Sequence, residues 1–179
     1  MSQKIKLCLD LDGVLVDLHR GLKDRLNFEF PSDHNDENRQ KIHAMWYDIS
    51  HTWPGFWSTL PPTKEYMVIY EACLTVDPLL LICSATPEPF TGADNAQCAA
   101  EKCAWVQEHL GYDQATRTII TKSKLKQTWM QHGAINILVD DHPGNIRRWN
   151  KAGGVGIYHT NLQRTLEELS KWKWNFSAI

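Results

Sequence analysis

The sequence lacks three features that would each place a protein in a broad class. It has no excess of lysine and arginine, and the formal net charge of -2 argues against an extended nucleic-acid-binding surface, which needs clustered cations. No apolar run approaches the length of a membrane span, and residues 1–4 are too short and polar for a signal peptide. We therefore expect a cytoplasmic protein without a membrane partner.

The sequence also lacks an even number of cysteines. Cys8 and Cys83 fall in predicted strands, where cysteine packs as a small hydrophobic residue, and an odd count cannot pair completely. Cys98 and Cys103 lie five apart on a predicted helix, off the four-residue spacing that places side chains on one face, so no metal site is expected there. We expect reduced thiols in the core for all five cysteines, Cys8, Cys73, Cys83, Cys98 and Cys103.

The length of 179 residues allows one substantial core and a small insertion. From residue 79 onward, strand and helix patterns alternate, which predicts an α/β, Rossmann-like and mainly parallel sheet with helices on both faces. The predicted strands are residues 79–83, 117–121, 135–139 and 155–158, and the predicted helices are 93–110, a shorter one after Pro143 and 162–169.

Residues 18–76 break this alternation. They contain no convincing strand but two helical segments, 36–49 and 63–74, so we interpret them as a small helical cap inserted after the first strand. Residues 1–17 and 77–179 then form the α/β core. The cap contains a cluster of five aromatic residues, Trp46, Tyr47, Trp53, Phe56 and Trp57. Most of them are expected to form the cap's own core, although one or two could stack on a base.

The first strand ends in two acids one residue apart, followed by a glycine. Because the chain can curl at Gly13, Asp10 and Asp12 can face one pocket at the carboxyl edge of the sheet. Buried carboxylates need a cation, and oxygen donors without a neighbouring His or Cys favour Mg2+. Taken alone, the pattern also fits a strand followed by an ordinary Asp-Gly turn.

A second acidic site repeats the design of the first. A later apolar strand ends in Asp140 and Asp141, and parallel strands bring both acidic ends to the edge where open α/β sheets bind ligands. Two further strand ends add the hydroxyl of Ser84 and the ammonium groups of Lys122 and Lys124. Together these groups indicate a metal-dependent phosphoryl-transfer site.

The order of these groups resembles the haloacid dehalogenase-like superfamily, and within it the 5'(3')-deoxyribonucleotidases. The resemblance implies a Mg2+-dependent phosphatase, of the 5'-nucleotidase type, that acts on deoxyribonucleoside 5'(3')-monophosphates. It extends over about residues 5–160, and the narrower part rests on residues 9–17, 54–57, 82–84, 101–111 and 138–141.

The resemblance also implies roles for the four acids. Asp10 would be the nucleophile that forms an aspartyl-phosphate, and Asp12 would protonate the leaving oxygen and then activate water. The Asp10 and Asp141 carboxylates and the Asp12 backbone carbonyl would hold Mg2+, with Asp140 orienting metal-bound waters from behind.

Phosphate would be bound by Ser84 and Lys124. Lys122 competes for the second role. We prefer Lys124 because the family places its lysine three residues past the threonine that ends the strand, here Thr121.

The chain departs from the subfamily at two places. The turn that begins at Ser84 is one residue longer than the hydroxyl-rich turn of the family, and Leu18 stands where the family has an aromatic residue that helps hold the base. Both departures concern substrate choice rather than chemistry. The predicted substrate pocket consists of Leu18, Trp46, Phe56 and Trp57.

Three other polar residues are assigned structural roles. Asp17 is expected to cap the segment that enters the insertion or to tie down its loop. Asn145 is expected to cap the helix after the second acid pair, and His142 to be an exposed loop histidine.

Other functions remain compatible with these residues. The same chemistry could act on a sugar phosphate or on a polynucleotide 3'-phosphate. A phospho-aspartate receiver-like signalling module also uses acids, Mg2+, a hydroxyl and a lysine, but its phosphoacceptor lies on a middle strand and no helical insertion follows its first strand. The order of motifs therefore favours an enzyme. The sequence is also compatible with a homodimer.

Overall fold

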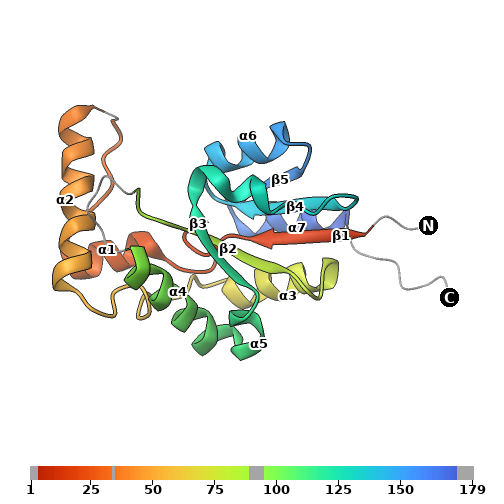
Figure 1. Cartoon of the computed structure of the whole chain (residues 1–179), viewed down its shortest axis with the longest axis horizontal. Helices are drawn as coiled ribbons and strands as arrows, with labels where there is room; N and C mark the ends of the chain where they lie inside the picture. The colour runs from red at the N-terminus through yellow and green to blue at the C-terminus, as the bar shows by residue number, and fades with distance from the viewer. Residues whose placement is uncertain (1–3, 34, 89–94, 173–179) are drawn as a thin grey trace.

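A computed structural model describes residues 4–33, 35–88 and 95–172 of the chain. Its centre is one sheet of five parallel strands in the order β3-β2-β1-β4-β5 (Figure 1). This sheet confirms the predicted Rossmann-like α/β fold. The strands are β1 (Ile5–Leu9), β2 (Leu81–Thr86), β3 (Thr118–Lys122), β4 (Ile135–Asp140) and β5 (Val155–Tyr158).

The sheet is covered on both faces, which explains why its strands are almost continuously apolar. Side chains alternate along β1, so Leu7 and Leu9 belong to one buried cluster and Cys8 to another. Helices α3 (Tyr66–Val76), α4 (Asn95–Leu110) and α7 (Leu162–Ser170) contribute to the first cluster, and α6 (Pro143–Lys151) contributes to the second.

Two short helical segments complete the core. The four-residue α5 (Tyr112–Ala115) follows α4, and a 3-10 helix, η2 (Ser123–Trp129), follows β3 and packs against α6. The sequence patterns did not predict η2. The predicted start of α4 at residue 93 lies outside the described residues.

Helices α1 (Leu18–Leu26) and α2 (Asp36–Thr52) stand together beyond the carboxyl ends of the strands (Figure 1). Asp17 caps α1 by accepting the Arg20 N–H at 3.0 Å, which confirms its predicted capping role. The sequence pattern did not predict α1, because Gly21 interrupts it. This glycine allows close packing, since a Cβ at Gly21 would overlap the buried side chain of Leu60.

Helix α3 packs against β1 and α7, within the helical layer of the core. Within the predicted insertion of residues 18–76, α1 and α2 therefore stand apart from the sheet and α3 lies on it. The division of the chain into core and cap stays a prediction.

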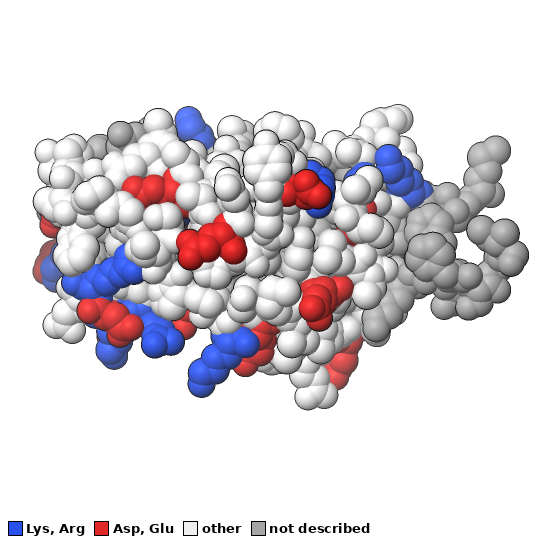
Figure 2. All heavy atoms as spheres, turned by 90° about the horizontal axis from the view of Figure 1, so that it is seen from below, with Lys and Arg blue, Asp and Glu red and all other residues white. Residues whose placement is uncertain are grey.

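The surface and the thiols agree with the composition. All five cysteines lie in the described part of the chain, where none forms a disulfide. Four are buried, as expected, whereas Cys103 is only partly buried. Acidic and basic side chains are interspersed over the face shown in Figure 2, with no extended area of lysine and arginine alone. Among the described residues, no helix is long and apolar enough to cross a membrane.

Candidate active site

The first acidic motif forms a tight turn at the end of β1. The Asp10 N–H still donates to the Val139 carbonyl at 2.9 Å, which continues the pairing of β1 with β4. The chain then turns through Gly13, whose φ of 74° is unfavourable for residues with a Cβ. A Cβ at Gly13 would also overlap the carboxylate of Asp141, so glycine permits the close approach of the two acidic segments.

Three carboxylates meet at this edge of the sheet. One oxygen from each of Asp10, Asp140 and Asp141 lies within 4.8 Å of the other two. Asp10 and Asp140 are 5% and 0% exposed, so their charges are removed from water. The structure therefore brings together three of the four predicted acids, while Asp12 lies beside them on the wall of the same cavity.

Crowding of these acids changes their protonation. Burial, and then the Asp140 carboxylate, raises the pKa of Asp10 well above its ordinary value, although the ammonium of Lys126 opposes this shift. The same two causes raise the pKa of Asp141 to about 7. A divalent cation with oxygen ligands would relieve this excess of negative charge, so the cluster fits an ion such as Mg2+.

The lysine that reaches the acids is Lys126. Its Nζ lies 2.7 Å from both Asp10 Oδ1 and Asp140 Oδ2, and its side chain is 2% exposed. Burial would lower the pKa of Lys126, but the two carboxylates raise it, so the ammonium stays charged. The structure does not bring Lys124 to the site: its side chain is 62% exposed and 4.0 Å from Glu88. The predicted placement of Lys124 is thus wrong and is corrected to Lys126.

The geometry of η2 explains this correction. A 3-10 helix has three residues per turn, so residues i and i+3 lie on the same side. Ser123 and Lys126 both point to the site, since Ser123 donates to Asn145 Oδ1 at 2.7 Å. Lys124 follows Ser123 by one residue and projects to the surface. Lys122 is also exposed.

Helix α6 holds the buried Asp140 in place. The Asn145 side-chain amide donates to both carboxylate oxygens of Asp140, at 3.0 and 2.9 Å, and the His142 N–H donates to Oδ1 at 2.8 Å. Asn145 is therefore an interior partner of the acid cluster and not the predicted helix cap. The cap is His142, whose exposed ring accepts the Gly144 N–H at 3.1 Å.

Ser84 lies on β2, which flanks β1 on the side away from β4, and is fully buried. Its hydroxyl accepts a hydrogen bond at 3.1 Å from a second buried lysine, Lys102 of α4. The sequence analysis gave Lys102 no role. A signal was available, because Lys102 lies four residues after Cys98 and three before Trp105, on the buried stripe of the helix.

A cavity of about 390 Å³ opens above the acids. Leu18, one of the predicted pocket residues, lines it. Phe30 is the aromatic side chain of its wall, and no prediction named it. Among the described residues, its lining is Asp10, Asp12, Gly13, Leu18, His19, Phe30, Pro31, Ile42, Asp141 and His142.

The other predicted pocket residues do not line this cavity. Phe56 and Trp57 are 1% and 4% exposed, and Trp46 stacks on Trp57 with ring centroids 5.2 Å apart. Phe56 and Trp57 belong to the main core cluster, and Trp46 packs against it. These three rings pack in the interior, but in a core shared with sheet residues such as Leu9 and not in a core of the cap's own, as was expected. Their placement in the substrate pocket is corrected, and the other two rings, Tyr47 and Trp53, are exposed.

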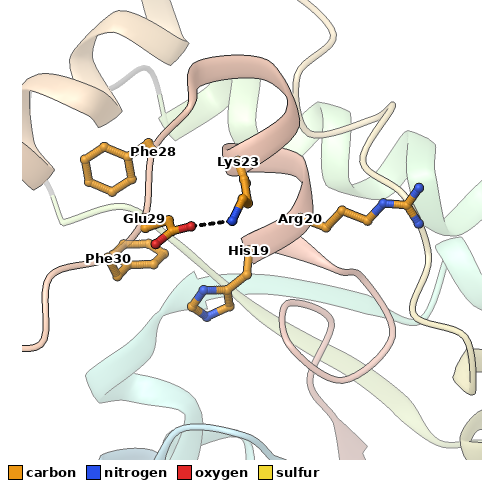
Figure 3. Close-up of a pocket in the computed structure, with 6 residues that line it drawn as sticks. All are labelled: His19, Arg20, Lys23, Phe28, Glu29 and Phe30. Carbon is orange, nitrogen blue, oxygen red and sulfur yellow. Dashed lines mark hydrogen bonds and ion pairs between the residues drawn. The ribbon is translucent and has the colours of Figure 1, made fainter.

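A second cavity, of about 380 Å³, shares His19 and Phe30 with the first (Figure 3). It lies between α1 and the segment that follows it. Lys23 on its wall is paired with Glu29 at 2.6 Å, and Arg20 with Asp24 at 3.3 Å. The cations of this second cavity therefore have carboxylate partners. In the first cavity, by contrast, the acids outnumber the cations beside them.

Comparison with known proteins identifies the family. A Bordetella bronchiseptica protein with the provisional name 5'(3')-deoxyribonucleotidase is 31% identical over 94% of this chain and 90% of its own length. The chain belongs to the 5'(3')-deoxyribonucleotidase family. It is therefore an enzyme of the phosphatase and nucleotidase class.

Two further proteins are more distantly similar to this chain. The human 5'(3')-deoxyribonucleotidase of cytosolic type is 25% identical over 69% of this chain and 67% of its own. A solved structure of a provisionally named haloacid dehalogenase-like hydrolase from Burkholderia xenovorans is 16% identical, with a TM-score of 0.46, over 92% of this chain and 85% of its own. No protein-family model matches the chain.

Proposed function

We propose that this nucleotidase-family enzyme is a Mg2+-dependent phosphomonoester hydrolase that acts through an aspartyl-phosphate on Asp10. The observation that carries the proposal is the position of Asp10, which lies on a cavity wall and is paired with a buried lysine beside two further acids. A carboxylate so placed can attack a phosphorus atom held in the cavity. The acids and Lys126 supply the charges that phosphoryl transfer requires.

Each step is assigned to residues of this chain. An Asp10 carboxylate oxygen forms the bond to phosphorus, and Lys126 stabilises negative charge on both Asp10 and the phosphoryl group. Ser84 is proposed to donate a hydrogen bond to a phosphoryl oxygen. Asp12 gives a proton to the leaving oxygen and later takes one from the water that hydrolyses the aspartyl-phosphate.

The proposed metal ligands are Asp10, Asp141 and the Asp12 backbone carbonyl, with Asp140 behind them. When bound, Mg2+ would neutralise charge on the phosphoryl oxygens. Asp140 is suited to a supporting role because Lys126, Asn145 and the His142 N–H already occupy its oxygens.

We propose deoxyribonucleoside 5'(3')-monophosphates as substrates. The relatives are named for this activity, and the cavity combines an acidic floor with the apolar walls Leu18, Phe30 and Ile42. Phe30 can stack on a base in place of the aromatic residue that Leu18 replaces. We also propose the cytoplasm as the place of action, since the human relative is named as the cytosolic type.

A substrate panel tests this proposal. Phosphate release is measured from 5' and 3' deoxyribonucleotides, 5' and 3' ribonucleotides, sugar phosphates and a 3'-phosphorylated oligonucleotide, with Mg2+ and with chelator. We expect Mg2+-dependent release that favours the deoxyribonucleotides. Release only from sugar phosphates or from the oligonucleotide would contradict the substrate assignment, and no release from any compound would contradict the chemistry.

A further inference from the structure

Lys102 is a buried lysine in the site that the proposed mechanism does not use. It is 1% exposed and reaches from α4 to the carboxyl ends of β1 and β2. Its Nζ donates to the Asp12 carboxylate at Oδ2, to Ser84 Oγ at 3.1 Å and to the Ala85 carbonyl at 2.5 Å. A lysine ammonium has three N–H donors, and these three acceptors use all of them.

The surroundings of Lys102 fix its position. The Trp57 ring lies beside the ammonium, with Nζ 4.8 Å from the ring centroid. Trp57 is itself held by the residue next to Lys102, because Glu101 accepts the backbone N–H groups of Gly55 and Trp57 at 2.8 and 2.9 Å. The Asp12 carboxylate in contact with Nζ favours the charged ammonium form of Lys102.

This contact makes the two oxygens of Asp12 unequal. An ammonium can only donate, so Asp12 Oδ2 must accept from it. Asp12 Oδ1 is buried and has no hydrogen-bond partner among the described residues. A proton carried by the Asp12 side chain in this arrangement therefore resides on Oδ1.

We propose that Lys102 is a positioning residue that holds Asp12 by Oδ2, so that Oδ1 delivers the proton to the leaving oxygen. This inference rests on the proposed function. In the first step, an Asp10 oxygen forms a bond to phosphorus, the bond from phosphorus to the leaving oxygen breaks, and its electron pair stays on that oxygen. The Oδ1 proton passes to the same oxygen, which leaves as an alcohol, and Asp12 becomes a carboxylate that Lys102 stabilises.

The role of Lys102 predicts a dependence on the leaving group. A nucleoside alkoxide is a poor leaving group and needs the proton from Asp12, whereas p-nitrophenolate leaves without one. Loss of Lys102 should therefore slow the release of a nucleoside far more than the release of p-nitrophenolate. A lysine that only bound phosphate or supported the fold would affect both substrates alike.

The test compares Lys102→Met with the wild type on a deoxyribonucleoside monophosphate and on p-nitrophenyl phosphate. We expect kcat for the nucleotide to fall about 100-fold, the scale of general acid catalysis, with KM changed less than about 3-fold, and kcat for p-nitrophenyl phosphate to fall less than about 5-fold. Lys151→Met, at an exposed position on α6, is the matched control and should behave as wild type. Equal loss on both substrates, or a rise in KM alone, would overturn the positioning role.

A second set of variants covers the case in which Lys102→Met fails to fold. Lys102→Arg keeps the charge and the donors but moves the head group, and should show the same selective loss. In an Asp12→Asn background, Lys102→Met should cause no further loss with p-nitrophenyl phosphate, because the partner of Lys102 is already changed. A full additional loss there would contradict action through Asp12. A wild-type enzyme inactive on both substrates would instead contradict the proposed function itself.

Discussion

Lys126 connects two buried acids from different strands. Its ammonium lies 2.7 Å from carboxylate oxygens of both Asp10 and Asp140. Removing one partner of a buried ion pair leaves a charge without compensation, which costs about 3–5 kcal/mol. Lys126 thus supports the fold and the charge balance of the site together.

We therefore expect Lys126→Met to lower phosphate release at least about 100-fold, since it removes a charge that stabilises the transferring group. The same variant should lower the free energy of unfolding by about 3–5 kcal/mol, because two buried carboxylates lose their shared cation. Lys124→Met is the matched control. Phosphate release and urea unfolding of both variants provide the measurement.

Wild-type behaviour is expected for Lys124→Met, because the Lys124 side chain is 62% exposed and lies 4.0 Å from its acidic neighbour. Loss of activity in Lys124→Met with an unaffected Lys126→Met would contradict this account. It would show that the active-site lysine is Lys124, as the family spacing predicts, and not Lys126, which η2 places beside the acids.

These residues show how far the sequence determines the site. Asp10 and Asp141 could be placed because a strand end and a parallel sheet dictate where such acids lie. Lys126 could not, because its direction depends on the three-residue turn of η2. The burial of Lys102 could have been predicted from its place on the apolar stripe of α4, but its partner could not, because Asp12 lies 90 residues away and only the packed fold brings the two together.

At the scale of elements, α4 joins the core to the segment around Trp57. Glu101 on α4 accepts the backbone N–H groups of Gly55 and Trp57, so one carboxylate satisfies two backbone donors of this turn. The neighbouring Lys102 contacts Asp12. Helix α4 therefore couples this turn to the carboxyl edge of the sheet, where the proposed active site lies.

We expect Glu101→Ala to loosen this turn without unfolding the sheet. The two freed N–H groups would each cost about 1–3 kcal/mol. In hydrogen exchange, the amides of Gly55 and Trp57 should lose protection while those of β1 and β4 keep it. Glu108→Ala, at an exposed position on the same helix, is the control. Unchanged protection at both amides of the Glu101 variant would contradict the coupling.

The elements themselves were predicted with uneven success. Strands β4 and β5 were placed within one residue of their observed ends, because buried parallel strands are apolar throughout and are bounded by turn residues. Helix α1 was missed because Gly21 has a low helix propensity, although its lack of a side chain is what permits contact with Leu60. Tertiary packing therefore stabilises a helix that local helix propensity alone does not predict.

At the scale of the whole molecule, the acid cluster links stability to pH and to metal. The pKa of Asp141 is about 7 in the folded protein, against an ordinary 3.8. Between these values the folded state holds a proton that the unfolded chain has lost, so this group destabilises the metal-free protein as pH rises toward 7. The lowered pKa values of His142 and His159 act in the opposite direction.

If Mg2+ binds these acids as proposed, it must displace that proton, so it should stabilise the protein more at pH 8 than at pH 5. At pH 8 and 100 times the Kd, we expect the thermal midpoint to rise by about 5–10 °C. Thermal unfolding with Mg2+ and with chelator measures this shift. Asp141→Asn should remove most of the difference between the two pH values, and an equal Mg2+ shift at both pH values in the wild type would argue against the site.

The central claim is that Asp10 is the nucleophile of a phosphomonoester hydrolase. The most direct test is phosphate release from a deoxyribonucleoside monophosphate in Mg2+ by the wild type and by Asp10→Asn. An amide is too weak a nucleophile to attack phosphorus, so we expect no turnover by the variant and a cooperative unfolding transition that shows an intact fold. Turnover near the wild-type rate by a folded Asp10→Asn protein would contradict the account.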